Sequence, residues 1–350
     1  MTPAVELLKQ LISTPSPSRR EEATASLLFD YLQKAGAEPR REANNVWAVA
    51  PGYASSRPTL LLNSHHDTVD PVAGYTRDPY APDIIDGRLY GLGSNDAGGS
   101  VVALTETFLN LRNSPLAVNL ILAISAEEEV SGANGISLLL PAIEAEGYKI
   151  DMAIVGEPTQ LQPAVGERGL VVLDCVAHGR AGHAARQEGD NALYHAIDDI
   201  NRLRNFSFEK ESPLLGPIGI NVTMINAGSR HNVVPDRCEF VVDVRTTDAY
   251  SNAETVAIIA DMLQSDVVPR SPRLSASAIP LNHPLVEKTV ATGRVPFVSP
   301  TMSDMALMHK FPSLKIGPGD SARSHTADEF IFVSEIQEAV DFYTSLIKSL

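Results

Sequence analysis

The sequence predicts an α/β protein into which a smaller α+β domain is inserted, and three observations support this fold class. The first is a set of short apolar runs separated by polar or helical segments, the pattern of a sheet covered by helices; the runs are 46–50, 59–62 and 120–124. The second is the different texture of 170–278, where strand-like and helix-like stretches follow one another closely. The third is the return of the first pattern after Pro280. We therefore expect one discontinuous domain, 1–169 with 279–350, and one inserted domain, 170–278.

The individual elements follow from the spacing of apolar residues. Val5, Leu8 and Leu11 recur at helical spacing until Pro15, and a second helix is expected from about residue 19 to residue 35. Within the insertion we expect two helices among three or four strands. The strand-like segments are 170–177, 218–225 and 239–245, and the helical ones are 191–203 and 252–263.

Composition limits the class of protein. The chain has 350 residues, of which 44% are hydrophobic and 20% charged, as in an ordinary globular protein with about two domains. Its formal net charge of −15 argues against nucleic acid or an anionic membrane as a partner. Cys175 and Cys238 do not make a disulfide scaffold, and no signal-peptide or membrane-spanning pattern is present. We therefore expect a cytoplasmic protein that binds neither nucleic acid nor membrane.

The first chemical motif is a His-x-Asp directly after an apolar strand, at His65 and Asp67. Side chains alternate along a strand, so His65 and Asp67 share a face and His66 points away. A metal-bound His usually has a carboxylate behind it that fixes its tautomer, and Asp67 is placed for that task. The alternative is a pair of surface His residues at a strand end.

A glycine-rich segment supplies the second motif, Gly91-Leu-Gly-Ser-Asn-Asp96. It does not fit a dinucleotide-binding loop, because Asp96 stands where the third glycine belongs and would repel a pyrophosphate. The glycines instead allow a tight turn that brings Asp96 into a site. A plain turn, with Asp96 capping the helix that follows, is the alternative.

Three consecutive carboxylates, Glu127 to Glu129, follow the apolar run 120–124. Carboxylates at the end of a buried strand are costly unless a cation compensates them, and a divalent metal would do so. The alternative is an acidic first turn at a helix N-terminus. Glu157 ends another apolar strand and His325 lies in a turn-rich loop, so all these groups are predicted to converge at the carboxyl ends of the strands.

Taken together, the motifs resemble the M20 metallopeptidase family, which includes N-acyl-amino-acid deacylases. The matching segments occur in the family order and span most of the chain; they are 11–16, 64–69, 91–96, 127–132, 156–159 and the loop of His325. The resemblance implies a three-layer, zinc-peptidase-like catalytic domain. It also implies that the insertion is a ferredoxin-like lid through which two chains form a homodimer.

The resemblance implies a dinuclear zinc centre, with cobalt or manganese as alternatives. The ligands would be His65, Asp96 and Glu157 for one ion, and Asp96, Glu129 and His325 for the other. Glu128 is implied as the general base and Asp67 as the carboxylate behind His65. A cis peptide bond is implied after Asp96.

Substrate contacts are implied in and beyond the insertion. His183 would reach the partner's site and bind the carbonyl oxygen, although a helix-capping or core His is the alternative. Asn232 and Arg245 would contact the substrate from the lid, and Arg245 would clamp a carboxylate unless it is a surface strand residue. Ser303 lies in a loop that resembles the one touching the carboxylate end of the substrate.

The expected activity is hydrolysis of the N-acyl group of an N-acyl-amino acid, and N-acetylornithine, from arginine biosynthesis, is the first choice. N-succinylornithine, N-acyl-citrulline and succinyl-diaminopimelate stay open, because Gly98 and Glu127 depart from residues common in the family. The sequence is also compatible with a related di- or aminopeptidase and with a catalytically dead binding protein. The chain lacks the G-x-S-x-G motif of serine hydrolases.

Overall fold

The computed structural model describes residues 2–186 and 188–350, and the chain divides into two compact units. The larger unit contains Met1–Val165, Ile279–Phe297 and Ser303–Leu350. The inserted unit contains Gly166–Ala278 and Val298–Met302.

A mixed sheet forms the centre of the larger unit, with strand order β1-β2-β6-β3-β7-β17-β8. The strands are β1 Arg40–Glu42, β2 Asn45–Val49, β3 Thr59–His65, β6 Asn119–Ser125, β7 Met152–Val155, β8 Ala164–Glu167 and β17 Ser313–Lys315. The central strands β3, β6 and β7 are parallel and buried along their whole length, which explains their continuous apolar sequences. Their carboxyl ends therefore meet at one edge of the sheet.

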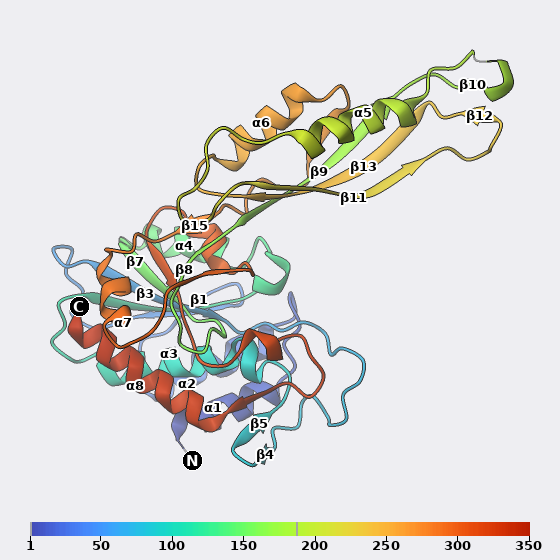
Figure 1. The fold of residues 1–350 in the computed structure, drawn as a ribbon. Coiled ribbons are helices and arrows are strands. Elements are labelled where there is room, and N and C mark those ends of the chain that lie inside the picture. The colour runs from blue at the N-terminus through green and yellow to red at the C-terminus, as the bar shows by residue number, and fades with distance from the viewer. Residues whose placement is uncertain (1, 187) are drawn as a thin grey trace. The chain divides into compact units, whose positions relative to one another are not determined.

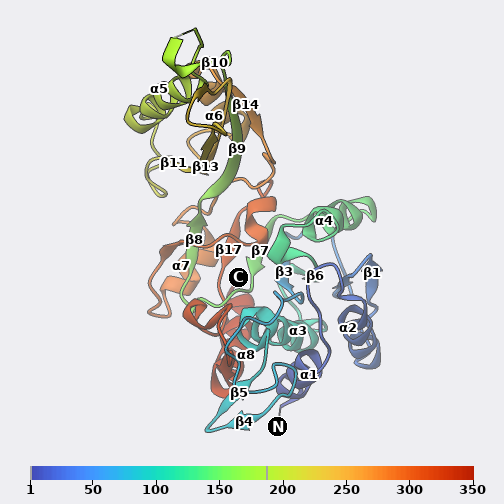
Figure 2. The same cartoon turned by 90° about the vertical axis from the view of Figure 1, so that its right-hand side faces the viewer.

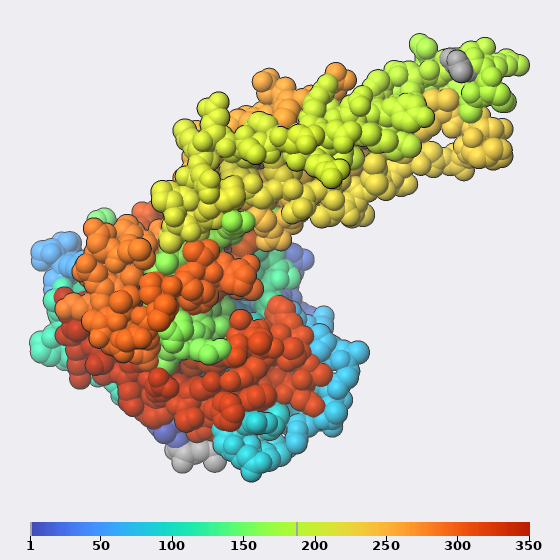
Figure 3. All heavy atoms as spheres, viewed as in Figure 1, coloured from blue at the N-terminus to red at the C-terminus, as the bar shows by residue number. Residues whose placement is uncertain are grey.

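Helices cover both faces of this sheet (Figures 1 and 2). On one face α3 packs against β3, β6 and α8, with α1 beside it; on the other, α4 packs against β6 and β1. The helices of this unit are α1 Pro3–Ile12, α2 Glu22–Lys34, α3 Gly99–Leu111, α4 Ile136–Ala145, α7 Pro284–Val290 and α8 Val333–Ser349. Space-filling atoms show the C-terminal segment, in red, covering much of the viewed face of this unit (Figure 3).

A small antiparallel sheet also belongs to the larger unit. The strands β4 Ile84–Ile85, β5 Arg88–Tyr90 and β18 Phe330–Phe332 pair in the order β18-β5-β4.

The second helix begins at Glu22, three residues later than predicted, because Arg19 adopts a left-handed backbone conformation with φ of 71°.

The inserted unit is an antiparallel sheet with two helices packed on one face (Figure 1). The strand order is β11-β13-β9-β14, and β9 alternates buried and partly exposed residues as a sheet covered on one face requires. Its main elements are β9 Gly169–His178, α5 Ala192–Asn205, β11 Gly219–Ala227, β13 Arg237–Thr246, α6 Asn252–Met262 and β14 Asp266–Pro269. The short strands are β10 Gly182–His183, β12 Val233–Val234, β15 Ser277–Ala278 and β16 Phe297–Ser299.

The fold class predicted from the sequence is confirmed. It consists of a mixed α/β sheet between helical layers and a separate ferredoxin-like antiparallel sheet. Within residues 2–186 and 188–350, no helix has the length and apolar character needed to cross a membrane.

Candidate metal centre

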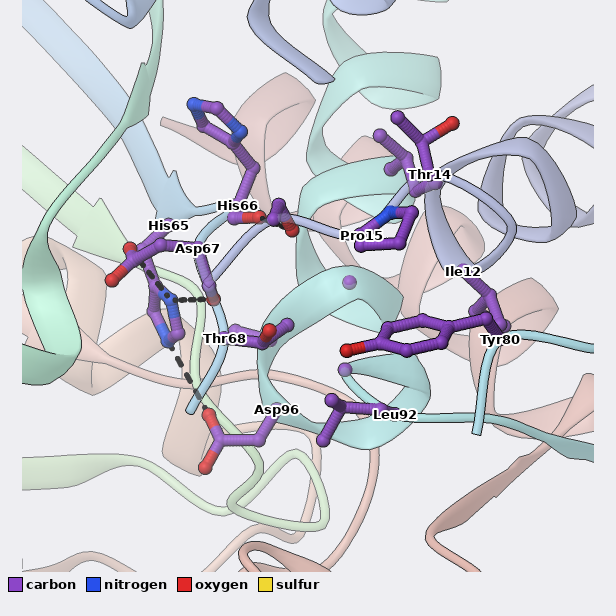
Figure 4. A pocket seen from close by; sticks show the side chains of 15 residues that line it. Ile12, Thr14, Pro15, His65, His66, Asp67, Thr68, Tyr80, Leu92 and Asp96 are labelled. Atoms are coloured by element: carbon purple, nitrogen blue, oxygen red, sulfur yellow. Dashed lines mark hydrogen bonds and ion pairs between the residues drawn. The ribbon is translucent and has the colours of Figure 1, made fainter. Parts of the chain in front are cut away.

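His65 is the last residue of β3, and its imidazole points toward Asp96 (Figure 4). Its Nε2 lies 3.3 Å from Asp96 Oδ1, and its Nδ1 lies 3.0 Å from the main-chain oxygen of Asp67 and 3.4 Å from the Asp67 carboxylate. His66 turns the opposite way and its Nδ1 meets the hydroxyl of Thr24 at 2.9 Å. Both rings are buried, 1% and 6% exposed, so this is not a pair of surface His residues.

Asp96 lies between two imidazoles. Its Oδ1 faces His65, and its Oδ2 is 3.7 Å from the Nε2 of His325. The loop that carries it needs glycine at Gly91 and Gly93, where φ is 145° and 74°. The peptide bond between Asp96 and Ala97 is cis, as the resemblance implied.

The acidic segment after β6 is held by Asp67. The carboxylate of Asp67 accepts the backbone N–H groups of Glu128 at 3.0 Å and Glu129 at 3.2 Å, and the hydroxyl of Ser18 at 2.7 Å. Glu127 instead turns its carboxylate to Asn134, which donates to it at 2.8 Å and 3.2 Å. Only two of the three consecutive acids therefore face the cluster.

The remaining side chains complete two adjoining groups. The Nε2 of His325 lies 3.0 Å from Glu129 Oε2, and the Nε2 of His65 lies 3.7 Å from Glu157 Oε1 and 3.9 Å from Glu128 Oε2. His65, Asp96 and Glu129 each offer a ligand atom, and these atoms all lie within 4.8 Å of one another. The structure thus brings together the predicted metal ligands, the predicted base and Asp67: His65, Asp67, Asp96, Glu128, Glu129, Glu157 and His325.

The charges of this cluster call for a cation. Burial raises the pKa of Glu128 well above its usual value, and burial raises that of Glu157 to about 8. Burial alone would lower the pKa of His65, but the surrounding carboxylates, Glu128 first, hold it well above its usual value. Buried carboxylates this close are costly without compensation, and divalent metal ions supply it. Imidazole nitrogens and carboxylate oxygens are donors that suit zinc, and cobalt and manganese also accept them.

Sequence reasoning missed Asp304, an acid beside the cluster. It is 3% exposed, it accepts a hydrogen bond from Ser125 Oγ at 2.5 Å, and burial raises its pKa to about 6. Ser303, the neighbour predicted to bind substrate, accepts the N–H of Met305 at 3.4 Å and so caps a short helical turn. The position of Asp304 directly after Ser303 was the sequence signal that could have identified it.

The other missed residue is Glu329, four residues after His325. Its carboxylate accepts backbone N–H groups from the loop that carries Asp96. Nothing in its local sequence pattern marked it, because its partners are more than 230 positions away along the chain.

The other predicted substrate contacts belong to the inserted unit. His183 lies in β10 opposite Val233 of β12, and the N–H of Ala184 donates to the Asn232 main-chain oxygen at 3.1 Å, so His183 and Asn232 lie together. Arg245 lies in β13, where its guanidinium makes two hydrogen bonds, of 2.8 and 3.1 Å, to the carboxylate of Asp243.

Comparison with known proteins assigns the family. The sequence profile described as Peptidase family M20/M25/M40 matches residues 61–349. The chain belongs to this family. This M20 chain is 28% identical to the acetylornithine deacetylase of Shigella sonnei over 374 aligned positions, which cover 97% of the chain and 96% of that protein. It is therefore a metal-dependent hydrolase.

Solved structures share the fold of this M20 chain. Aminopeptidase PepT of Bacillus cereus matches with a TM-score of 0.79 and 17% identity, over 99% of this chain and 97% of that one. YxeP of Bacillus subtilis, a dinuclear metal-binding peptidase of the M20 family, matches with a TM-score of 0.71 and 17% identity, over 99% and 97%.

Proposed function

We propose that this chain is a dinuclear-zinc amidohydrolase that removes the N-acyl group of an N-acyl-amino acid, with N-acetylornithine as its first candidate substrate. One observation carries the dinuclear assignment: the two carboxylate oxygens of Asp96 face different imidazoles, one on His65 and one on His325. The full-length similarity to an acetylornithine deacetylase supports the acyl substrate.

The ligand atoms sort into two sets that share Asp96. His65, Asp96 and Glu157 would hold one ion, and Asp96, Glu129 and His325 would hold the other. Both sets contain one imidazole and two carboxylates, which leaves room for substrate at each ion, as catalytic sites require. Cobalt or manganese would fit the same donors.

Glu128 is the proposed general base. Of the three carboxylates near Nε2 of His65, on Asp96, Glu128 and Glu157, it is the one assigned to neither ion. Burial raises its pKa well above the usual value, which favours uptake of a proton. When bound, the metal ions would supply Lewis-acid polarisation and make a water molecule acidic. Glu128 would take the proton of the attacking water and hand it to the leaving amine nitrogen, while Asp67 holds the Glu128 main chain in place.

Substrate contacts and assembly are further parts of the proposal. In the proposed dimer, His183 would reach the site of the partner chain and donate to the acyl oxygen there, and Asn232, Arg245 and Ser303 would contact the amino-acid portion. We also propose a homodimer through the inserted unit. Edge strand β11 exposes Met224 and Ile225, 64% and 50%, and Tyr194 of α5 is 65% exposed; such apolar edges are commonly covered by a partner.

Two further activities stay in competition. Desuccinylation of N-succinylornithine, N-acyl-citrulline or succinyl-diaminopimelate would use the same centre. The similarity in fold to peptidases such as PepT favours a second candidate, a metal-dependent di- or aminopeptidase.

A substrate panel separates these activities. The zinc-loaded protein is assayed for amine release from N-acetylornithine, the N-succinyl and N-acyl-citrulline compounds, and a set of di- and tripeptides. We expect turnover of an N-acyl-amino acid. Turnover of peptides alone would replace the deacylase with a peptidase, and a protein that binds zinc but turns over neither class would contradict both enzymes.

A further inference from the structure

The turn that follows His325 is tied to the loop of Asp96 through Glu329. One oxygen of the Glu329 carboxylate accepts the N–H groups of Asn95 at 2.8 Å and Asp96 at 2.9 Å, and the other accepts the N–H of Gly93 at 3.1 Å. The main-chain oxygen of Glu329 accepts the N–H of Gly91 at 2.9 Å. The side chain is only 2% exposed, so water does not compete for these bonds.

A carboxylate is the group this loop requires. The Gly93–Asp96 turn has left-handed backbone at Gly93 and non-helical backbone at Asp96, so its N–H groups do not all find partners in a regular helix or strand. Buried N–H groups need acceptors, and both oxygens of the Glu329 carboxyl group accept them here. The amide of glutamine would present N–H groups to one side of the same loop, where donor would face donor.

The same turn carries a proposed ligand and the carboxylate that holds the Asp96 loop. His325 stands at its start with φ of 56°, and Glu329 follows four residues later, just before β18 pairs with β5. Asp328, between them, holds a different segment: it accepts the N–H and hydroxyl of Thr76 at 2.9 and 2.5 Å. Glu329 therefore ties the loop of Asp96 to the segment of His325, and Asn95 does so as well, through Asp320 and Ser324.

We propose that Glu329 is a positioning residue that holds the shared carboxylate of Asp96 in register with both imidazoles, and that metal affinity depends on it. The inference rests on the proposed dinuclear centre. Partners of this kind, which orient a ligand without touching the metal, typically cost about 10–100-fold in affinity or activity when removed.

The test compares Glu329→Gln with wild type, and Asp328→Asn is the matched control because it removes a carboxylate from the same turn that does not reach the Asp96 loop. Zinc and cobalt stoichiometry and affinity are measured by titration calorimetry on the metal-free proteins, beside the visible spectrum of the cobalt forms and the midpoint of thermal unfolding without metal. We expect Glu329→Gln to bind metal about 10–100-fold more weakly with an altered cobalt spectrum. Asp328→Asn should stay close to wild type in both.

Each outcome decides one question. Wild-type affinity and spectrum in Glu329→Gln would overturn the positioning role, even if its unfolding midpoint fell. If Glu329→Gln does not fold, Glu329→Asp takes its place in the test, because it keeps the carboxylate acceptors but shortens the side chain by one methylene. A metal affinity of Glu329→Asp equal to that of wild type would again overturn the positioning role. A wild-type protein that binds no metal would instead remove the proposed function itself.

Discussion

At the scale of single residues, Asp67 connects His65 to the acidic segment that carries Glu128 and Glu129. It lies behind His65 and also accepts the backbone N–H groups of Glu128 and Glu129. One carboxylate therefore orients a proposed ligand, the proposed base and a second ligand. Burial raises its pKa, but its contacts with His65, Ser18 and His66 together outweigh burial and leave that pKa below the usual value, so Asp67 stays ionised in this role.

The role of Glu128 is tested by Glu128→Gln. The amide keeps the size of the side chain but cannot accept a proton, so turnover should fall by at least about 100-fold, the scale of general-base catalysis. Metal content should not change, because Glu128 belongs to neither ligand set. Steady-state kinetics and metal analysis check the two statements.

Glu127→Gln is the control for this substitution. Glu127 is the neighbouring acid, but its carboxylate binds Asn134 rather than the cluster, so activity should stay near that of wild type. Glu128→Gln with more than a tenth of wild-type turnover would exclude Glu128 as the base.

The positions of candidate site residues could be predicted where polar groups lie at the end of an apolar strand. His65 is the last residue of buried strand β3, Asp67 and Glu157 follow buried strands by two residues, and alternation along β3 fixes which side chain faces the cluster. Asp304 and Glu329 were not predicted because their hydrogen-bond partners, Ser125 and the Asp96 loop, lie far away in the sequence. Tertiary hydrogen bonds of that kind leave no periodic signal.

At the scale of elements, the inserted unit depends on one hydrophobic core between its sheet and its two helices. Cys175 and Cys238 lie in that core, 1% and 0% exposed, and burial raises the pKa of the Cys175 thiol to about 12. A thiol in that state is neither ionised nor accessible at pH 8, and the thiolate is the reactive form.

We therefore expect the native protein to resist thiol reagents. Titration with a chromogenic disulfide at pH 8 should label neither cysteine in the folded protein and both of them in denaturant. Rapid labelling of the folded protein would show that the β9 and β13 core opens readily.

The start of α5 offers a test of helix capping. The side chain of Asn191 accepts the N–H of Leu193 at 3.0 Å, so Asn191→Ala should destabilise the helix by about 1 kcal/mol. Faster hydrogen exchange of the α5 amides is the measurement. Asn201→Ala, an exposed position within the same helix, is the control and should not accelerate exchange, because alanine favours helix. Equal exchange in the two variants would contradict the cap.

At the scale of the whole molecule, the proposed ligands come from separate segments of the larger unit, and ions bound among them would stabilise that unit against unfolding. Free metal at a hundred times its dissociation constant adds about 2.7 kcal/mol per site. Trp47, the single tryptophan, is 2% exposed in β2 of this unit, so its fluorescence reports on the unfolding of the larger unit.

Chelation should therefore lower the unfolding midpoint followed by Trp47 fluorescence, and added zinc should restore it. His178, an exposed histidine of the inserted unit, provides the control for adventitious binding: His178→Ala should show the same zinc-dependent shift. An unfolding midpoint that changes with neither chelator nor zinc would argue that no bound ion stabilises the larger unit.

The interrupted course of the larger unit has a consequence for biosynthesis. Glu157 precedes Gly166–Ala278, and His325 follows it, so a ribosome must make the entire inserted unit between the two. A nascent chain that has emerged only as far as the insertion contains the proposed ligands of one cation but lacks His325, the proposed imidazole ligand of the second. Binding of the proposed pair of ions must therefore wait until His325 has been made.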